Sequence, residues 1–204
     1  AKDGKSGLLF IVQARPETVF ARSDEATLKI YSIDEKLISN LKETNQVLAT
    51  GHAVGNRIAS GRVRTYRSYS EVLEQKRALQ KEISEGVLLE EMEYENRVFE
   101  EGDVLVTEMT TPDWEPLMKQ ASLIITRKGG RTSHAAIIAR EFGIPAIVGC
   151  TGAMNLDNHC VVTGSCAEGD TGYVYAGEHP FDINVISVKS DTKLKTKIKL
   201  NVGF

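Results

Sequence analysis

Residues 127–143 read RKGGRTSHAAIIAREFG, and they directly follow the apolar run ASLIIT at residues 121–126. The apolar run predicts a buried strand, the glycine-rich stretch predicts a loop, and the small and apolar residues after it predict a helix. Gly143 and Pro145 lie where a helix commonly stops, because glycine adopts the left-handed cap conformation and proline cannot continue the helix. The stretch therefore predicts a strand, a loop and a helix in that order.

His134 is expected in the first turn of this helix, at the end of the glycine-rich loop. A helix N-terminus leaves backbone N–H groups unpaired and favours an anion, while its positive end disfavours an imidazolium ion. A neutral ring nitrogen can attack phosphorus, and Arg127 and Lys128 add positive charge nearby. We therefore predict a phosphohistidine at His134. The residues expected to support its phosphate are Gly129, Gly130, Arg131, Thr132 and Ser133.

Further strands and a helix are expected on both sides of this stretch. GDVLVT (102–107) and IPAIVGC (144–150) predict strands, and TPDWEPLMKQA (111–121) predicts a helix with Thr111 as its cap. The segments 51–66 and 161–177 predict short strands around glycine turns. Alternating strands and helices indicate α/β packing.

The outer segments are interpreted as parts of a larger arrangement. Residues 1–20 predict a hairpin, residues 21–48 a linker with weak helical spacing, and residues 178–204 a linker followed by a strand whose partners lie outside the chain. The charged stretch EVLEQKRALQKEI (71–83) predicts a surface helix.

Composition excludes several classes of protein. The net charge is −3 and 41% of residues are hydrophobic, which argues against a nucleic-acid partner and against a membrane span. Three cysteines without a C-x-x-C pair make a disulfide framework an unlikely choice, and no metal ligands are assigned. A cytoplasmic protein is expected.

The stretch GDVLVTEMTTPDWEPLMKQASLIITRKGGRTSHAAIIAREFGIPAIVGC resembles the phosphohistidine signature of the phosphoenolpyruvate-utilising enzymes. ATGHAVGNRIASGRVR resembles the strand region before it, LLFIVQARPET the last strand of an ATP-grasp nucleotide domain, and TKIKLNVGF the first strand of a phosphoenolpyruvate-binding barrel. The resemblance implies a swivelling β/β/α phosphohistidine domain at 49–177. It implies that 1–20 end the ATP-grasp domain, that 21–48 are a linker, and that 178–204 are a linker and the first barrel strand.

The resemblance also implies a reaction for the whole enzyme, in which ATP, pyruvate and water give AMP, phosphoenolpyruvate and phosphate. His134 would carry the phosphoryl group between the nucleotide domain and the pyruvate-binding barrel, and the linkers would act as hinges. Gln13 and Arg15 would belong to the ATP site, and Mg²⁺ would bind outside this chain.

Two alternatives remain open from the sequence. The same carrier chemistry could serve another acceptor, as in pyruvate, phosphate dikinase, Enzyme I or an antibiotic phosphotransferase. A non-catalytic interaction module could instead keep the fold, although such a module would be expected to lose the intact loop at 127–134.

Overall fold

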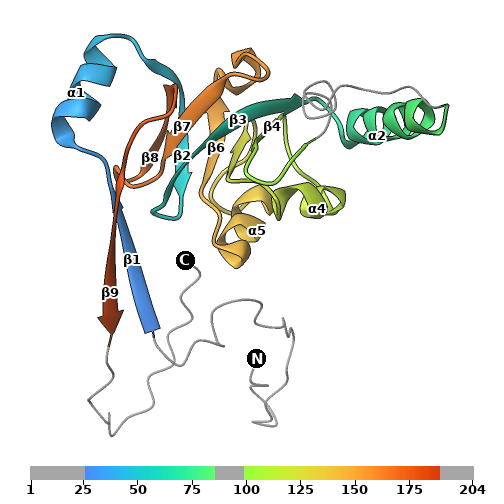
Figure 1. Ribbon diagram of the computed structural model, residues 1–204. Helices are drawn as coiled ribbons and strands as arrows, with labels where there is room; N and C mark the ends of the chain where they lie inside the picture. Colours follow the sequence, from blue (N-terminus) through green and yellow to red (C-terminus); the bar gives the residue numbers. More distant parts are fainter. Residues whose placement is uncertain (1–25, 86–98, 189–204) are drawn as a thin grey trace, which may run out of the picture.

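The structure is a computed structural model that describes residues 26–85 and 99–188 (Figure 1). The hairpin predicted at 1–20 and the strand predicted at 193–204 lie outside the described residues. The elements, in chain order, are β1 (Ala26–Ser32), α1 (Glu35–Glu43), β2 (Val47–Val54), β3 (Ile58–Tyr66), α2 (Tyr69–Ser84), β4 (Val104–Thr107), η1 (Pro112–Trp114), α4 (Glu115–Met118), β5 (Leu123–Thr126), α5 (His134–Phe142), β6 (Ala146–Thr151), η2 (Ala153–Asn155), β7 (Val161–Ser165), β8 (Thr171–Ala176) and β9 (Asp182–Val188).

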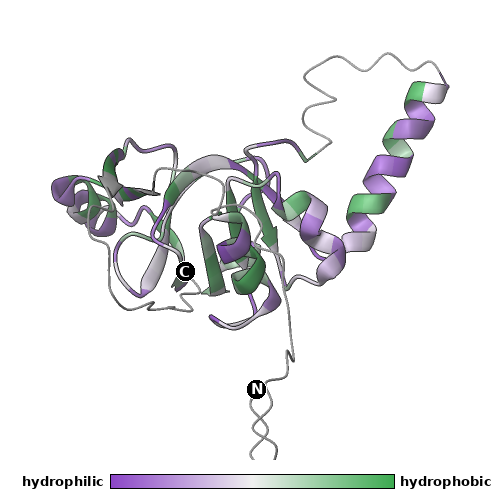
Figure 2. Cartoon of the chain, turned by 90° about the horizontal axis from the view of Figure 1, so that it is seen from below, coloured by the Kyte–Doolittle hydropathy of each residue, from purple (hydrophilic) through white to green (hydrophobic). Residues whose placement is uncertain are grey.

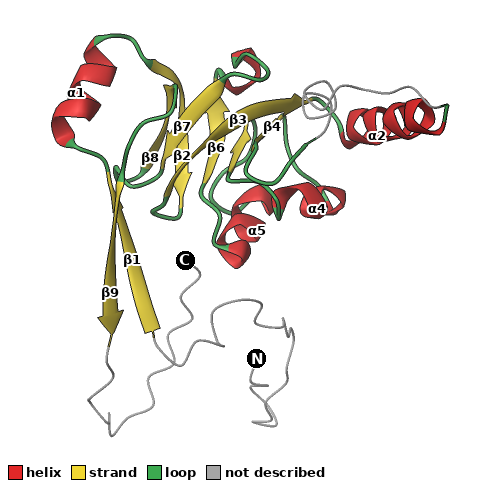
Figure 3. Cartoon of the chain, viewed as in Figure 1, coloured by secondary structure: helices red, strands yellow, loops and turns green. Residues whose placement is uncertain are grey.

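Seven of these strands close into a barrel in the order β2-β6-β5-β4-β3-β7-β8. The four strands β3, β4, β5 and β6 run parallel, and the remaining pairings are antiparallel. The connections between parallel strands carry the helical segments, as crossovers between parallel strands require (Figure 3). This mixed α/β architecture, a barrel with helices packed on it, confirms the predicted fold class.

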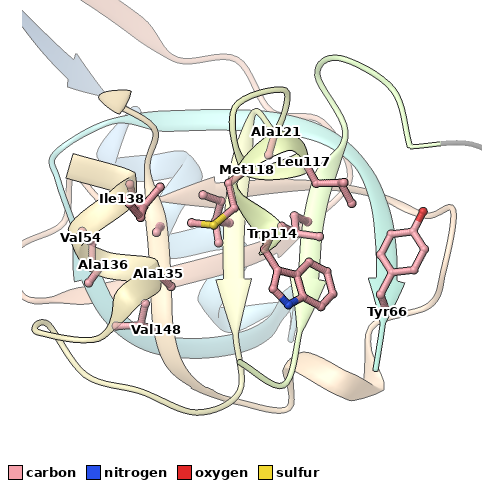
Figure 4. Packing of buried hydrophobic residues seen from close by; sticks show 14 of the residues in the cluster. Val54, Tyr66, Trp114, Leu117, Met118, Ala121, Ala135, Ala136, Ile138 and Val148 are labelled. Carbon is pink, nitrogen blue, oxygen red and sulfur yellow. The ribbon is translucent and has the colours of Figure 1, made fainter. Parts of the chain in front are cut away.

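Strands β4 and β5 are buried on both faces, and their alternate residues contribute to two cores. Val104 and Val106 of β4 point into the barrel, whereas Leu105 packs outside with the helices. On β5, Ile124 likewise packs outside. Figure 4 shows part of this outer core, where side chains from both helical segments meet the barrel wall. Its labelled members are Val54, Tyr66, Trp114, Leu117, Met118, Ala121, Ala135, Ala136, Ile138 and Val148.

The helix predicted over 111–121 is shorter and split. Residues 112–114 form the 3-10 turn η1 and residues 115–118 form α4. Pro116 contributes no N–H to a continuous helix, which explains the break after Trp114. Thr111 occupies the cap position, but its side chain makes no capping hydrogen bond. Trp114 is 3% exposed, as expected for a packing residue.

The segments predicted as linkers contain regular structure. Strands β1 and β9 pair antiparallel as a two-stranded ribbon that extends away from the barrel (Figure 1). The described part of 178–204 therefore finds its strand partner inside the chain. Helix α1 forms within 21–48, where the sequence showed weak helical spacing. Lys42 at its end pairs with Glu168 at 3.0 Å and lies over the ring of Tyr173, which ties α1 to the barrel.

Helix α2 confirms the predicted surface helix and projects as a mostly hydrophilic rod (Figure 2). Its first residue, Tyr69, packs edge-on against Trp114 with ring centroids 5.5 Å apart. Val72 and Leu79 are its buried residues. Within the described ranges, 26–85 and 99–188, no helix combines the length and apolarity required to cross a bilayer.

Candidate functional site

The candidate site lies at the carboxyl ends of the parallel strands β4 and β5. Strands β4 and β5 end at Thr107 and Thr126, which are neighbours in the register. Residues paired across adjacent strands continue this level of the barrel from β5 through β6 to His52 on β2. His52 in turn pairs with Thr171, the first residue of β8. Because barrel strands are staggered, the loop after β5 thus lies level with the turn between β7 and β8.

Helix α5 carries His134 as its first residue, as predicted. Gly143 ends the helix in the left-handed conformation, with φ of 66°, also as predicted. Ser133 occupies the N-cap position with extended backbone, yet its hydroxyl makes no capping hydrogen bond. That hydroxyl instead lies under Gly129, 3.0 Å from where a Cβ of residue 129 would stand. The N–H groups of the first helical turn therefore keep their anion-binding capacity.

The imidazole of His134 is half-buried and has one hydrogen-bond partner on the ring. Its Nδ1 lies 3.0 Å from Oγ1 of Thr110, which comes from the loop after β4. Thr110 is 6% exposed, so the hydroxyl is held in place by its surroundings. When the Nδ1–H donates to this oxygen, Nε2 carries the lone pair.

The glycine loop approaches β6 closely. Gly129 has φ of 109°, a conformation that glycine adopts at no steric cost. Its carbonyl oxygen lies 2.7 Å from where a Cβ of Gly149 would stand. Gly149 itself has φ of 62° at a point where the β2–β6 register shifts. A glycine bulge in β6 thus provides the room in which the loop sits.

Two of the cations in the loop are engaged by one carboxylate. Arg127 donates from Nε to Oε1 of Glu108 at 2.6 Å, and its Nη2 lies 2.6 Å from Oε2. Lys128 reaches the same Oε2 at 3.6 Å. The hydrogen bond from Arg127 lowers the pKa of Glu108, and the same contact raises the pKa of Arg127. One carboxylate therefore offsets about half of the positive charge expected from Arg127 and Lys128.

Arg131 reaches across the end of the barrel. Its Nη2 donates to Oδ1 of Asp170 at 2.6 Å and to the backbone oxygen of Asp170 at 3.1 Å. The carbonyl of Arg131 accepts from Nη1 of Arg140 at 2.7 Å. The structure therefore places the Arg131 guanidinium on the β7–β8 turn, while Gly129, Gly130, Thr132, Ser133 and His134 stay together in the loop.

Three buried hydroxyls lie at the ends of β4 and β5 and at the N-cap of α5. In the described part of the chain, the side-chain oxygens of Thr107, Thr126 and Ser133 are buried and have no hydrogen-bond partner. Thr107 and Thr126 are fully buried, at 0% exposure. Buried hydroxyls usually have partners, and each of these three can still form a hydrogen bond.

Cys150 and Cys166 are buried and poorly suited to act as nucleophiles. Burial raises the pKa of Cys150 to about 12 and that of Cys166 to about 11, which disfavours the thiolate. The described ranges contain no group of three or more His, Cys, Asp or Glu side chains arranged to hold a metal ion.

Sequence reasoning missed three residues of the site: Thr110, Glu108 and Asp170. Each contacts the loop from another part of the chain, and none belongs to a pattern that would have marked it. Gln13 and Arg15, predicted for an ATP site, lie outside the described residues.

Comparison with known proteins gives a family match for part of the chain. Residues 99–169 match the family model "PEP-utilising enzyme, mobile domain". The chain is 44% identical along its whole length to phosphoenolpyruvate synthase of Aquifex aeolicus, covering 21% of that protein, and 46% identical to phosphoenolpyruvate synthase of Pseudomonas aeruginosa, covering 22%. The chain therefore spans about a fifth of the length of the curated relatives it matches.

Among solved structures, an Enzyme I structure aligns with 52% of this chain and 49% of its own, at 24% identity and a TM-score of 0.31. The family match includes β4, β5 and α5 and ends at residue 169, directly before Asp170. The relatives match the whole chain. Residues 99–169 of this chain therefore carry the mobile domain of the PEP-utilising enzymes.

Proposed function

We propose that this chain is a phosphoryl carrier and that Nε2 of His134 is the atom that bears the phosphoryl group. The observation that carries the proposal is the contact between Nδ1 and the buried hydroxyl of Thr110. It fixes the ring and assigns the lone pair to Nε2 when Nδ1 holds the proton. The helix N-terminus and the loop amides then favour the added negative charge.

In the transfer step, this chain supplies the nucleophile and the groups around it, and the donor brings the phosphoryl group. Nε2 attacks the phosphorus of the donor, the N–P bond forms, and the bond from phosphorus to the leaving oxygen breaks. The proton on Nδ1 stays with the ring and continues to donate to Thr110. The positive charge that develops on the ring is thus spread towards a fixed oxygen, and the phosphoryl oxygens face the amides of the loop and of α5.

For the whole enzyme, we propose the reaction of ATP, pyruvate and water to AMP, phosphoenolpyruvate and phosphate. The relatives that support this proposal are named phosphoenolpyruvate synthases, and this chain spans about a fifth of their length. An ATP-grasp domain, to which Gln13 and Arg15 would belong, and a pyruvate-binding barrel would be the partners. The domain limits follow the same proposal: the carrier at 49–177, flanked by linkers at 21–48 and from 178 onwards.

Magnesium does not fit the carrier loop itself. Two carboxylates contact the loop and both are engaged by its cations, Glu108 by Arg127 and Lys128 and Asp170 by Arg131. No ligand group of three acidic, histidine or cysteine side chains occurs within 26–85 and 99–188. Because hard cations need several free oxygen ligands, any Mg²⁺ of the reaction would be bound by other parts of the enzyme.

Chemical phosphorylation tests the proposal on this chain alone. Phosphoramidate donates a phosphoryl group to accessible imidazole nitrogens and releases ammonia. We expect acid-labile phosphate on His134, seen as a gain of one phosphoryl mass and placed by peptide mapping at neutral pH. Phosphorus NMR should identify the Nε2 isomer, since the Nδ1 and Nε2 adducts have different shifts.

The controls are two single variants. His134→Ala should lose the label. His179→Ala should keep it, because the Nε2 of that ring is engaged with the carbonyl of Ala176 at 2.7 Å. Label that persists at the wild-type level in His134→Ala would contradict the carrier role of His134. Label on Nδ1 of His134 would contradict the proposed role of Thr110.

A further inference from the structure

Arg131 is the loop cation whose partner is most easily exchanged. Asp170, its partner, is 91% exposed, and the guanidinium is 44% exposed. An ion pair in such a position contributes little to stability, because water competes for both groups. By contrast, Glu108 is 30% exposed and holds two cations at once.

The contact with Asp170 occupies the part of the guanidinium that a phosphate would need. Both hydrogen bonds to Asp170 come from Nη2. A guanidinium presents two flat edges with paired donors, one formed by Nη1 and Nη2 and one formed by Nε and Nη2. Each edge includes Nη2. A two-point contact with phosphoryl oxygens therefore uses Nη2 and competes with Asp170 for that nitrogen.

The backbone of Asp170 is anchored beside the loop. The backbone oxygen of Asp170 also accepts from the N–H of Ala53 on β2 at 3.0 Å. The preceding Gly169 makes the turn with φ of 89°. The turn thus offers an anion to Arg131 at the level of the barrel where the loop after β5 begins.

We propose that Asp170 is the resident anion of Arg131 and that it yields this side chain to the phosphoryl group when His134 is phosphorylated. The inference rests on the carrier role proposed above and extends it to the position of Arg131 before and after transfer. Asp170 is a positioning residue that acts through Arg131 and does not touch the phosphorus.

The exchange is favourable on electrostatic grounds. A phosphoryl group carries close to two negative charges and three acceptor oxygens, whereas the carboxylate carries one charge. Arg131 gains a stronger charge-assisted contact, and the released carboxylate of Asp170 returns to water in which it is already largely immersed. The unphosphorylated loop meanwhile keeps Arg131 paired, so no free guanidinium competes for other anions.

The test observes Arg131 directly in the 204-residue chain. The protein is labelled with ¹⁵N-arginine, and the side-chain signals of Arg131 are identified by their loss in Arg131→Lys. Phosphoramidate is then added, and phosphate on His134 is followed in the same sample. We expect the Arg131 side-chain signals to shift in step with phosphorylation. In Asp170→Asn they should already be shifted before phosphoramidate is added.

The rate of labelling provides a second readout. Removing the competing carboxylate in Asp170→Asn should raise the rate on His134 about two- to fivefold, the range that corresponds to an exposed ion pair. In an Arg131→Ala background the same substitution should have no effect. Glu168→Gln, which alters an acid two residues earlier in the same turn, should label at the wild-type rate.

The possible results separate the two proposals. Label on His134 with unmoved Arg131 signals overturns the exchange and leaves the carrier role intact. An Asp170→Asn rate equal to or below that of wild type overturns it as well. Absence of label in wild type, in Asp170→Asn and in Glu168→Gln overturns the carrier role and the exchange together.

Discussion

A single hydroxyl determines which nitrogen of His134 is free. Thr110 Oγ1 lies 3.0 Å from Nδ1 and is fixed in a buried position. Thr110→Val keeps the shape of the side chain and removes the oxygen. We expect labelling of His134 by phosphoramidate to slow about three- to tenfold, the range that corresponds to one neutral hydrogen bond. Phosphorus NMR should also detect some of the Nδ1 adduct.

Thr65→Val is the matched control for this substitution. The hydroxyl of Thr65 is buried on the neighbouring strand β3 and has no partner among the described residues. Its removal should leave labelling and the isomer unchanged. If both variants label at the wild-type rate, the hydroxyl of Thr110 does not orient the imidazole.

Individual residues could be predicted where the signal was local. His134 and its glycines were predictable because strand, loop and helix follow one another within a few residues. Thr110 and Asp170 were not, because they lie 24 and 39 residues from the side chains that they contact. The phosphate-supporting residues stay predictions, and for Arg131 the structure adds a resting partner that the sequence did not indicate.

At the scale of elements, the loop depends on the bulge in β6. Alanine at Gly149 would place a methyl group 2.7 Å from the carbonyl oxygen of Gly129 and would have to adopt φ of 62°. We expect Gly149→Ala to cost about 1–3 kcal/mol in the free energy of unfolding. Displacement of the loop should also slow labelling of His134 at least severalfold. Urea denaturation and the phosphoramidate assay measure the two effects.

Gly152→Ala separates backbone strain from displacement of the loop. Gly152 lies just after β6 with φ of 87°. A Cβ added at this residue would lie 3.5 Å from its nearest neighbour, the carbonyl oxygen of Leu48, which is an ordinary contact. The variant should lose stability through the same kind of backbone strain, yet label at the wild-type rate. Equal labelling by both variants would show that the approach of Gly129 to β6 does not position the histidine.

The elements themselves were predicted to the extent that their signals were periodic. The apolar runs at 102–107, 121–126 and 144–150 became β4, β5 and β6, and the small-residue helix became α5. The helix at 111–121 was overestimated because Pro116 interrupts it. Closure of the barrel and the pairing of β1 with β9 depend on partners far apart in the sequence, which local patterns do not encode.

In the molecule as a whole, the candidate site and a buried ion cluster lie at opposite ends of strand β4. Strand β4 ends at Thr107, on the side of the histidine loop, and begins just after Asp103 on the opposite side. Asp103 is 4% exposed and accepts hydrogen bonds from Nε of Arg62 at 3.2 Å and from Nε of Arg64 at 3.0 Å. This buried carboxylate joins β3 to the start of β4, far along the strand from the site.

Asp103→Asn should therefore weaken the fold without altering the chemistry. The amide keeps the volume of the side chain but replaces an acceptor by a donor facing two guanidiniums, which we expect to cost about 2–4 kcal/mol in the free energy of unfolding. The exposed substitution Asp157→Asn should change it by less than about 0.5 kcal/mol. Because the folded fraction at 25 °C remains high after such a loss, Asp103→Asn should still label His134 at the wild-type rate per folded molecule. Urea denaturation gives the first quantity, and labelling normalised to near-ultraviolet circular dichroism gives the second. A large fall in the normalised rate would mean that the two ends of β4 are coupled, and that the ion cluster supports the geometry of the loop as well as the stability of the barrel.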